Sequence, residues 1–488
     1  MHSIIKKIKI NPFLLVITLV YAVLTIATLN NYYFWDVIQQ VSIEAHWFYE
    51  TNFSTLLIPH DNHLGIYATG YHPPLMSTMT ALLWKIFGRE LWVSHAFTAF
   101  WAILLIYNSW KLASRFFPKK YAGWVFLIVL LEPTVLTQFA ISSPDFILFT
   151  AFVIALRAVL ERKPILLAIG IFFLCCINMR GIFVGVMLFL SNLYFSYLQN
   201  GNKISIKLFT KTLVPYLPAL AVLAAYFAYY FLQKGWFFNH SVYAESYSMP
   251  QTWELIVRRI LVLGLRFLEQ GRFVIWALTL YFVFVFIKKK EKLSAVEKTL
   301  ALFALLMNGL YFLFVFISQM PFSPRYFMPQ FFVLSVLALM FVVKYFNAKR
   351  IKVIIGAVLF FVLSGHFWLY SDRIYQPWET TLLHLPFYEL RTEVFNYIDE
   401  NDFDYNDLSA GFSLAGNRGF IELAHYGKIV SSTNLNKRYF IYSNISFWRN
   451  DRVAELRDVE RWKPIKTFRR GVIFITIYQN LAFEKNIE

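Results

Sequence analysis

The chain has 488 residues, of which 58% are hydrophobic, and a mean hydropathy of +0.51. This composition excludes an ordinary soluble domain and predicts a polytopic α-helical membrane protein, because many apolar runs are long enough to cross a bilayer of about 30 Å. The net charge of +17 does not indicate nucleic-acid binding: residues 371–488 hold 15 Lys and Arg against 16 Asp and Glu, so the basic excess belongs to residues 1–370. The two adjacent cysteines, in an apolar run, exclude a disulfide framework.

Spanning length predicts about eleven transmembrane helices in residues 1–370. They are expected at 13–30, 91–109, 121–139, 145–160, 165–178, 181–199, 212–231, 272–287, 295–317, 326–343 and 353–370. Lys and Arg clusters fall at alternate ends of these segments if the N-terminus is cytoplasmic. The sequence therefore predicts a multi-pass protein of the cell (inner) membrane, with the first loop, 31–90, and a C-terminal domain, 371–488, on the extracytoplasmic side.

The first outer loop is far longer than an ordinary connection of about 2–8 residues. Apolar residues at helical spacing predict one amphipathic helix over 36–49. A second is expected over 75–88, because two prolines precede it and suit a first turn. We expect both helices to lie in the membrane interface.

The tail beyond residue 371 has a different character, with charged residues interspersed among apolar ones. A helix is predicted over 390–398, and strands at 429–430, 439–442 and 471–478. This pattern is typical of a small α/β domain, and about 110 residues are enough for a core of its own.

Two acidic residues stand at the predicted outer ends of membrane helices. Asp36 directly follows the aromatic residues that close the first span, where it could act as a general base or cap the next helix. Asp145, in a Ser-Ser-Pro-Asp sequence at the fourth span, could likewise cap that helix or line the same pocket as Asp36. Both alternatives remain open for both residues.

Basic and aromatic residues at the same outer face are candidates for binding an anion. Tyr71 and His72 precede paired prolines that fix the backbone, and His72 could serve as a donor or a partly charged partner, or simply lie at the lipid interface. Arg325, beside Tyr326, is suited to a phosphate, although an interfacial anchor is the alternative. Arg180, at the tip of a predicted hairpin, should either line a polar cavity or extend to the far interface.

A metal site has little support in the sequence. His60, Asp61 and His63 form a weak candidate for a divalent cation, because a loop without fixed geometry does not define a coordination shell. No cofactor is predicted with certainty.

The motifs, taken in order, resemble the GT-C superfamily of membrane glycosyltransferases. The nearest branch groups protein mannosyltransferases, aminoarabinose transferases of lipid A and lipopolysaccharide core transferases. The resemblance rests on Asp36 after the first span, His72-Pro73-Pro74-Leu75, the amphipathic Leu83-Trp84-Lys85-Ile86-Phe87-Gly88, Ser143-Pro144-Asp145 and Pro324-Arg325-Tyr326-Phe327-Met328-Pro329. Two positions depart from the family pattern: Val37 replaces a frequent second acidic residue, and His72 replaces a lysine common in the aminoarabinose branch.

The resemblance implies a GT-C-like bundle and a glycosyltransferase that moves one sugar, hexose or pentose, from a polyprenyl-phosphate donor. The acceptor, a lipid, glycan or protein, would lie on the extracytoplasmic face, in glycosylation of the cell envelope. By resemblance Asp36 is the catalytic residue, Asp145 helps to build the site and Arg325 holds the donor phosphate, with His72 or Arg180 assisting. A single displacement is expected to invert the anomeric carbon.

Two other functions are compatible with the sequence. A multi-pass transporter would suit the many spans, Arg180 and Asp145, although the chain lacks the repeat symmetry of many transporters. A polysaccharide polymerase or ligase would share the donor side and transfer an oligosaccharide.

Overall fold

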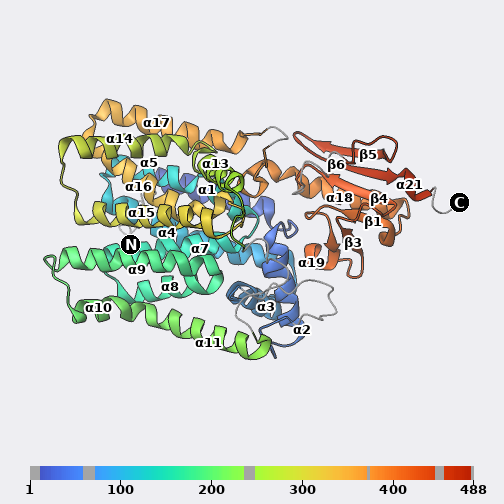
Figure 1. Ribbon diagram of the computed structural model, residues 1–488, viewed down its shortest axis with the longest axis horizontal. Helices are drawn as coiled ribbons and strands as arrows, with labels where there is room; N and C mark the ends of the chain where they lie inside the picture. Colours follow the sequence, from blue (N-terminus) through green and yellow to red (C-terminus); the bar gives the residue numbers. More distant parts are fainter. Residues whose placement is uncertain (1–10, 59–71, 236–247, 371–373, 446–454, 485–488) are drawn as a thin grey trace, which may run out of the picture.

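The computed structural model describes residues 11–58, 72–235, 248–370, 374–445 and 455–484. Long helices form a bundle at one end of the molecule, and a mixed sheet with short helices forms the other end (Figure 1). The helices of the first loop lie at the end of the bundle that faces the sheet (Figure 1). The first loop and the tail therefore meet at one end of the bundle.

The elements of the bundle are as follows. Its helices are α1 (Pro12–Thr28), α4 (Leu91–Phe116), α5 (Lys119–Leu130), α6 (Pro133–Ala140), α7 (Pro144–Glu161), α8 (Pro164–Ile177), α9 (Met179–Gln199), α10 (Ile206–Leu213), α11 (Leu217–Lys234), α13 (Trp253–Leu268), α14 (Phe273–Lys289), α15 (Ala295–Ile317), α16 (Met328–Tyr345) and α17 (Ala348–Ser364).

The first loop and the tail contribute shorter elements. The first loop has η1 (Ile38–Ile43), α2 (Glu44–Glu50) and α3 (Leu75–Phe87). The tail has η5 (Trp378–Thr380), α18 (Pro386–Glu400), β1 (Leu408–Ala410), β2 (Gly416–Asn417), α19 (Arg418–Glu422), β3 (Ile429–Ser432), β4 (Tyr439–Ser443), β5 (Trp462–Arg470), β6 (Ile473–Asn480) and α21 (Leu481–Glu484). The two predicted helices of the first loop are present, the first of them with a π-helical turn.

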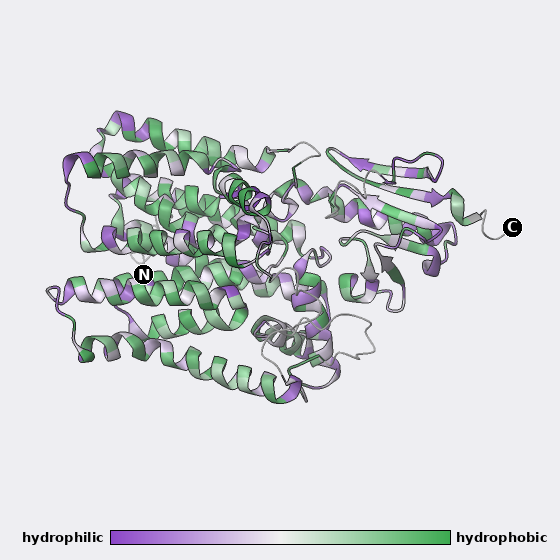
Figure 2. Cartoon of the chain, in the orientation of Figure 1, coloured by the Kyte–Doolittle hydropathy of each residue, from purple (hydrophilic) through white to green (hydrophobic). Residues whose placement is uncertain are grey.

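The bundle has the hydropathy of a multi-pass membrane protein. Apolar residues extend along its helices, and hydrophilic residues gather at its ends and over the sheet (Figure 2). Within the described residues, 6 helices are long and apolar enough to cross a membrane, or up to 8 if each of two bent pairs counts as one span. A helix occupies each predicted range, but the number of about eleven spans is not confirmed, because α1 and α8 are short and several helices are bent or charged.

Two helix pairs are sharply bent, and the first of them interrupts the predicted span 121–139. α5 and α6 meet at 57° where Pro133 follows Glu132, and α13 and α14 meet at 96°. A proline removes a helical hydrogen bond, which accounts for the first break. Arg272 at the second break donates to Glu132 at the first, with 2.8 Å from Nε to Oε1, so one buried ion pair joins the two bends.

The tail folds around a six-stranded sheet of order β2-β3-β1-β4-β6-β5. β1 runs parallel to β3 and β4, whereas β6 is antiparallel to β4 and β5. The predicted helix and the strands β3, β4 and β6 are present. β1, β2 and β5 were not predicted, because β1 and β2 have two or three residues and β5 is largely exposed and basic.

The core of the tail includes residues from the first loop. Phe34 and Trp35 are buried with the apolar residues of α18 and the sheet. The amide of Tyr33 donates to the carbonyl of Ile421 at 3.0 Å, and Ser42 Oγ donates to the carbonyl of Phe420 at 2.5 Å. The tail thus fixes the chain on both sides of Asp36.

Close packing of α7 on α8 sets the relation between two predicted site residues. A Cβ at Gly170 in α8 would lie 2.8 Å from the backbone nitrogen of Ala155 in α7. Small residues at such a contact let membrane helices approach closely. Asp145 begins α7 and Arg180 follows α8, so this contact helps to place both.

We predict that Gly170→Ala destabilises the bundle by about 1–3 kcal/mol, because the methyl group would force the two backbones apart. Gly309→Ala is the matched control, since among the described residues nothing lies within 4 Å of a Cβ built there. The control should leave stability unchanged or raise it by up to about 1 kcal/mol through helix propensity. Unfolding of the detergent-solubilised variants, followed by circular dichroism, measures both. Equal effects of the two substitutions would contradict the prediction.

Candidate active site

Arg325 lies at the centre of a charged cluster where the bundle meets the first loop. The turn that carries it, Pro324–Phe327, precedes α16, and the hydroxyl of Tyr311 donates to the carbonyl of Tyr326 at 2.8 Å. The Arg325 side chain is about 5% exposed. Its Nη2 forms an ion pair with Asp36, and its Nε lies 3.4 Å from Oδ2 of Asp145. One guanidinium therefore joins two carboxylates from distant parts of the sequence.

The capping alternatives for the two carboxylates do not match the geometry. The residue that precedes η1 is Val37, without a side-chain cap, so Asp36 does not cap this helix. Ser143 caps α7 by accepting a hydrogen bond from the amide of Asp145 at 3.1 Å. Asp145 occupies the first turn instead, where the helix dipole favours a negative charge. Both carboxylates are directed into the cluster.

Arg180 joins the cluster from the α8–α9 turn. Asn178 caps α9 by accepting from the amide of Arg180 at 3.0 Å. The Nη2 of Arg180 lies 2.5 Å from Oδ1 of Asp145, and its guanidinium stacks over the ring of Tyr326 at 4.0 Å. These contacts place Arg180 in a polar cluster at the end of the bundle, which speaks against snorkelling to the interface.

The charges and the burial of the cluster determine the protonation states of Asp36 and His72. Burial alone would raise the pKa of Asp36, but the charge and hydrogen bond of Arg325 outweigh it and hold that pKa below its usual range. Burial, assisted by the positive charge of Arg180, lowers the pKa of His72 to about 3. His72 is therefore neutral near pH 7, which removes the partly charged role and leaves that of a neutral donor or acceptor. Its carbonyl accepts from the hydroxyl of Tyr226 at 2.9 Å.

The structure adds one acidic residue that the sequence did not single out. Glu379, in η5 of the tail, is buried and accepts from Ser323 Oγ at 2.9 Å, two residues before Arg325. Its negative charge acts on Arg325. Nothing in the local sequence distinguishes Glu379 from the other carboxylates of the tail, so only the fold identifies it.

The remaining candidates lie outside the described residues. Tyr71 and the proposed metal ligands His60, Asp61 and His63 belong to the segment 59–71. Within the described part of the chain, there is no group of three or more His, Cys, Asp or Glu side chains arranged to hold a metal ion.

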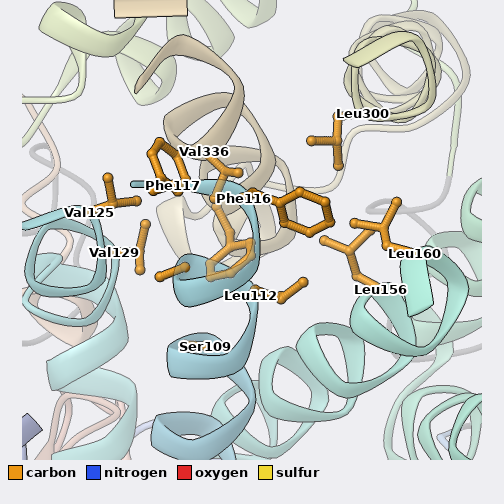
Figure 3. A pocket seen from close by; sticks show the side chains of 12 residues that line it. Ser109, Leu112, Phe116, Phe117, Val125, Val129, Leu156, Leu160, Leu300 and Val336 are labelled. Atoms are coloured by element: carbon orange, nitrogen blue, oxygen red, sulfur yellow. The ribbon is translucent and has the colours of Figure 1, made fainter. Parts of the chain in front are cut away.

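A separate pocket in the bundle differs in character from the charged cluster. Ser109 and Leu112 of α4, Val125 of α5, Leu156 of α7 and Val336 of α16 are among the residues that line it (Figure 3). Its walls are almost entirely apolar, and none of the charged residues of the cluster lines it. No ionisable side chain of the described residues lines this pocket, so it offers no group for acid–base chemistry or for binding a phosphate.

No protein-family profile and no curated protein matches the sequence. ArnT from Cupriavidus metallidurans bound to undecaprenyl phosphate has a similar structure, with a TM-score of 0.51 and 12% identity, covering 97% of this chain and 98% of that chain. The same protein in the apo state gives 0.49 and 13% identity, covering 96% and 97% of the two chains. The apo oligosaccharyltransferase from Archaeoglobus fulgidus gives 0.45 and 14% identity, covering 72% of this chain and 55% of that chain. ArnT is an aminoarabinose transferase of the GT-C superfamily. The chain thus shares the overall fold of ArnT, and this confirms, at the level of architecture, the GT-C resemblance predicted from the motifs.

Proposed function

We propose that this protein is a membrane glycosyltransferase that takes a monosaccharide from a polyprenyl-phosphate donor and transfers it to an acceptor hydroxyl or amine on the extracytoplasmic face. The observation that carries the proposal is the cluster in which Arg325 and Arg180 meet Asp36 and Asp145. A phosphate needs a planar cationic partner, and a displacement at an anomeric carbon needs a base beside it.

The fold supports the lipid-linked donor. ArnT, whose structure resembles this one, was solved with undecaprenyl phosphate bound. The cluster lies between the apolar bundle, which suits a polyprenyl chain, and the polar first loop and tail, which suit a sugar. A donor with one apolar and one polar end fits this junction.

The proposed reaction is a single displacement. An acceptor oxygen loses its proton to the Asp36 carboxylate and forms a bond with the anomeric carbon. The bond between that carbon and the phosphate oxygen breaks, and polyprenyl phosphate leaves with the electron pair. Arg325 and Arg180 stabilise the charge that develops on this phosphate. The sugar is transferred with inversion.

The charge balance of the cluster gives Arg325 a second part in this reaction. With no substrate bound, the two arginines are compensated by Asp36 and Asp145. A donor phosphate beside Arg325 and Arg180 competes with Asp36 for the same guanidinium. Asp36 then loses a stabilising partner for its ionised form, its pKa rises, and it becomes a stronger base where the acceptor is bound.

Asp36→Asn should lower the rate of sugar transfer about 100- to 10,000-fold, because the amide cannot accept the acceptor proton. The assay follows labelled sugar from a panel of polyprenyl-phosphate monosaccharides in membranes that contain the protein. Binding of undecaprenyl phosphate to the purified variant should persist, since Arg325 and Arg180 remain.

Glu90→Gln is the control for this substitution, because Glu90 is an exposed carboxylate in the same loop. It should leave transfer unchanged. Full activity of Asp36→Asn at normal expression would exclude Asp36 as the base. Uptake of labelled substrate into sealed vesicles, without sugar transfer in open membranes, would favour a transporter instead.

Arg180→Gln should weaken binding of undecaprenyl phosphate about ten- to a hundredfold, as expected for a lost hydrogen bond to a charged group. The Arg180 side chain is 25% exposed, so the variant should fold. Arg258→Gln removes the same charge from an exposed position on α13 and should leave binding unchanged. Equal loss in both variants would indicate a general effect of charge and would count against a phosphate site at Arg180.

The rate constant kcat/KM should fall only at a pH below the ordinary pKa of an aspartate side chain, because Arg325 depresses the pKa of Asp36 in the free protein. The rate constant kcat should begin to fall at a higher pH, because the bound phosphate competes with Asp36 for Arg325 and so raises the pKa of Asp36. Steady-state rates of transfer as a function of pH measure both decreases. If the two decreases occur at the same pH, the phosphate does not compete with Asp36 for Arg325.

A further inference from the structure

A second polar cleft lies at the end of the bundle away from the sheet, distant from the charged cluster. It is formed by the α7–α8 junction on one side and by the end of α9 with α10 on the other, and its cavity volume is about 600 Å³. Ligand sites usually measure about 300–1,000 Å³, so the cleft is large enough for a lipid head group. Neither the fold match nor the proposed reaction assigns it a role.

Cationic side chains from two separate segments converge on this cleft. Arg162 and Lys163 lie at the end of α7, and Lys207 and Lys211 lie one helical turn apart on α10. Lys163 is neutralised by Glu161, at 2.6 Å from Nζ to Oε2. Arg162, Lys207 and Lys211 have no carboxylate within ion-pair distance among the described residues. The cleft therefore carries uncompensated positive charge.

Neutral polar groups complete the walls. The lining includes Asn192, Ser196 and Gln199 of α9 and Ser205 at the start of α10. Asn192 is buried, with its Nδ2 3.5 Å from the hydroxyl of Tyr216. Amide and hydroxyl donors among the basic side chains are suited to an anion with several oxygens.

The outer face of the same region is apolar and exposed. Ile204 and Ile206 are 85% and 84% exposed, and Phe209 is 44% exposed. Such side chains beside Lys207 and Lys211 make α10 an amphipathic helix of the kind that lies in a membrane interface. An apolar surface next to a cationic cleft matches a molecule that has acyl chains and an anionic head group, whereas a free anion would use only the cleft.

We propose that the cleft between the α7–α8 junction and α10 binds the head group of an anionic phospholipid, with its acyl chains along the apolar face of α10. Basic pockets between membrane helices are suited to phosphate-bearing head groups. Arg162, Lys207 and Lys211 supply the charge. The bound lipid joins α10 to the α7–α8 junction. The site does not depend on the identity of the sugar or acceptor.

The test compares lipid binding in matched charge variants of the purified full chain, by native mass spectrometry. The probes are phosphatidylglycerol, phosphatidylcholine with the same acyl chains, and inorganic phosphate. Wild-type protein should retain phosphatidylglycerol in preference to phosphatidylcholine. The variant R162Q/K207Q/K211Q should bind phosphatidylglycerol roughly a hundredfold more weakly, since each basic residue near a lipid surface contributes about a fivefold factor.

The control variant is K288Q/K289Q/K290Q, which removes three positive charges at the end of α14, away from the cleft. It should bind phosphatidylglycerol like the wild type. If the first triple variant does not stay folded, Lys207→Gln alone replaces an exposed side chain and should give about a fivefold loss. Equal loss in both triple variants would overturn the site, and so would equal retention of the two phospholipids. Complete displacement of the lipid by millimolar inorganic phosphate would overturn the assignment to a lipid.

Discussion

The structure depends on one guanidinium group. The Arg325 side chain is almost completely buried. It forms ion pairs with Asp36 from the first loop and with Asp145 from α7. A buried charge without partners would cost several kcal/mol, so the fold must bring these carboxylates together or leave Arg325 out of the interior. Arg180 repeats the arrangement from the α8–α9 turn, by pairing with the second oxygen of Asp145. The close contact of Gly170 with α7, the capped start of α9 and the turn before α16 can all be understood as means of placing these four side chains.

The cluster also explains why a polar site can exist beside an apolar bundle. Without a ligand, the positive charges of Arg325 and Arg180 are balanced by the carboxylates of Asp36 and Asp145. The protein therefore does not bury an unpaired charge when no substrate is bound. In the proposed reaction, the same balance makes the site responsive, because the incoming donor is a phosphodiester with one negative charge that has to replace a carboxylate as the partner of an arginine. Asp36 is the carboxylate that can move away from the arginine more easily, because its side chain is 28% exposed, against 4% for Asp145. In the proposed reaction, Asp145 therefore stays in place within the cluster and Asp36 is the carboxylate that takes part in the chemistry.

Sequence reasoning identified the members of this cluster but not its geometry. The sequence shows four ionisable residues at the ends of apolar segments: Asp36, Asp145, Arg180 and Arg325. A charge at such a position is costly, so each of these residues is a candidate for a functional role. That Arg325 pairs with Asp36, 289 positions away, depends on the tertiary fold and has no local signal. Glu379 was missed for the same reason. Hydropathy also does not register a bend: the predicted range 121–139 contains the 57° break between α5 and α6, and the number of about eleven spans is not confirmed. In the tail, β5 is basic and largely exposed, so it lacks the run of apolar residues that marks β3, β4 and β6 in the sequence.

The position of Asp36 argues that the tail is part of the working site. The residue before it, Trp35, has a φ of 56°, a left-handed conformation that is uncommon for a large side chain and costs energy unless the surroundings enforce it. The surroundings here come from the tail: the Trp35 ring packs edge-to-face on Phe412, at 5.6 Å, and Phe34 stacks on His384 at 4.9 Å. Burial of these two aromatic rings offsets the local strain and turns the following carboxylate toward Arg325. Without the tail, the segment before Asp36 would lose the contacts that hold Trp35 in this conformation, and the carboxylate would lose its fixed direction although every charged residue of the cluster would still be present.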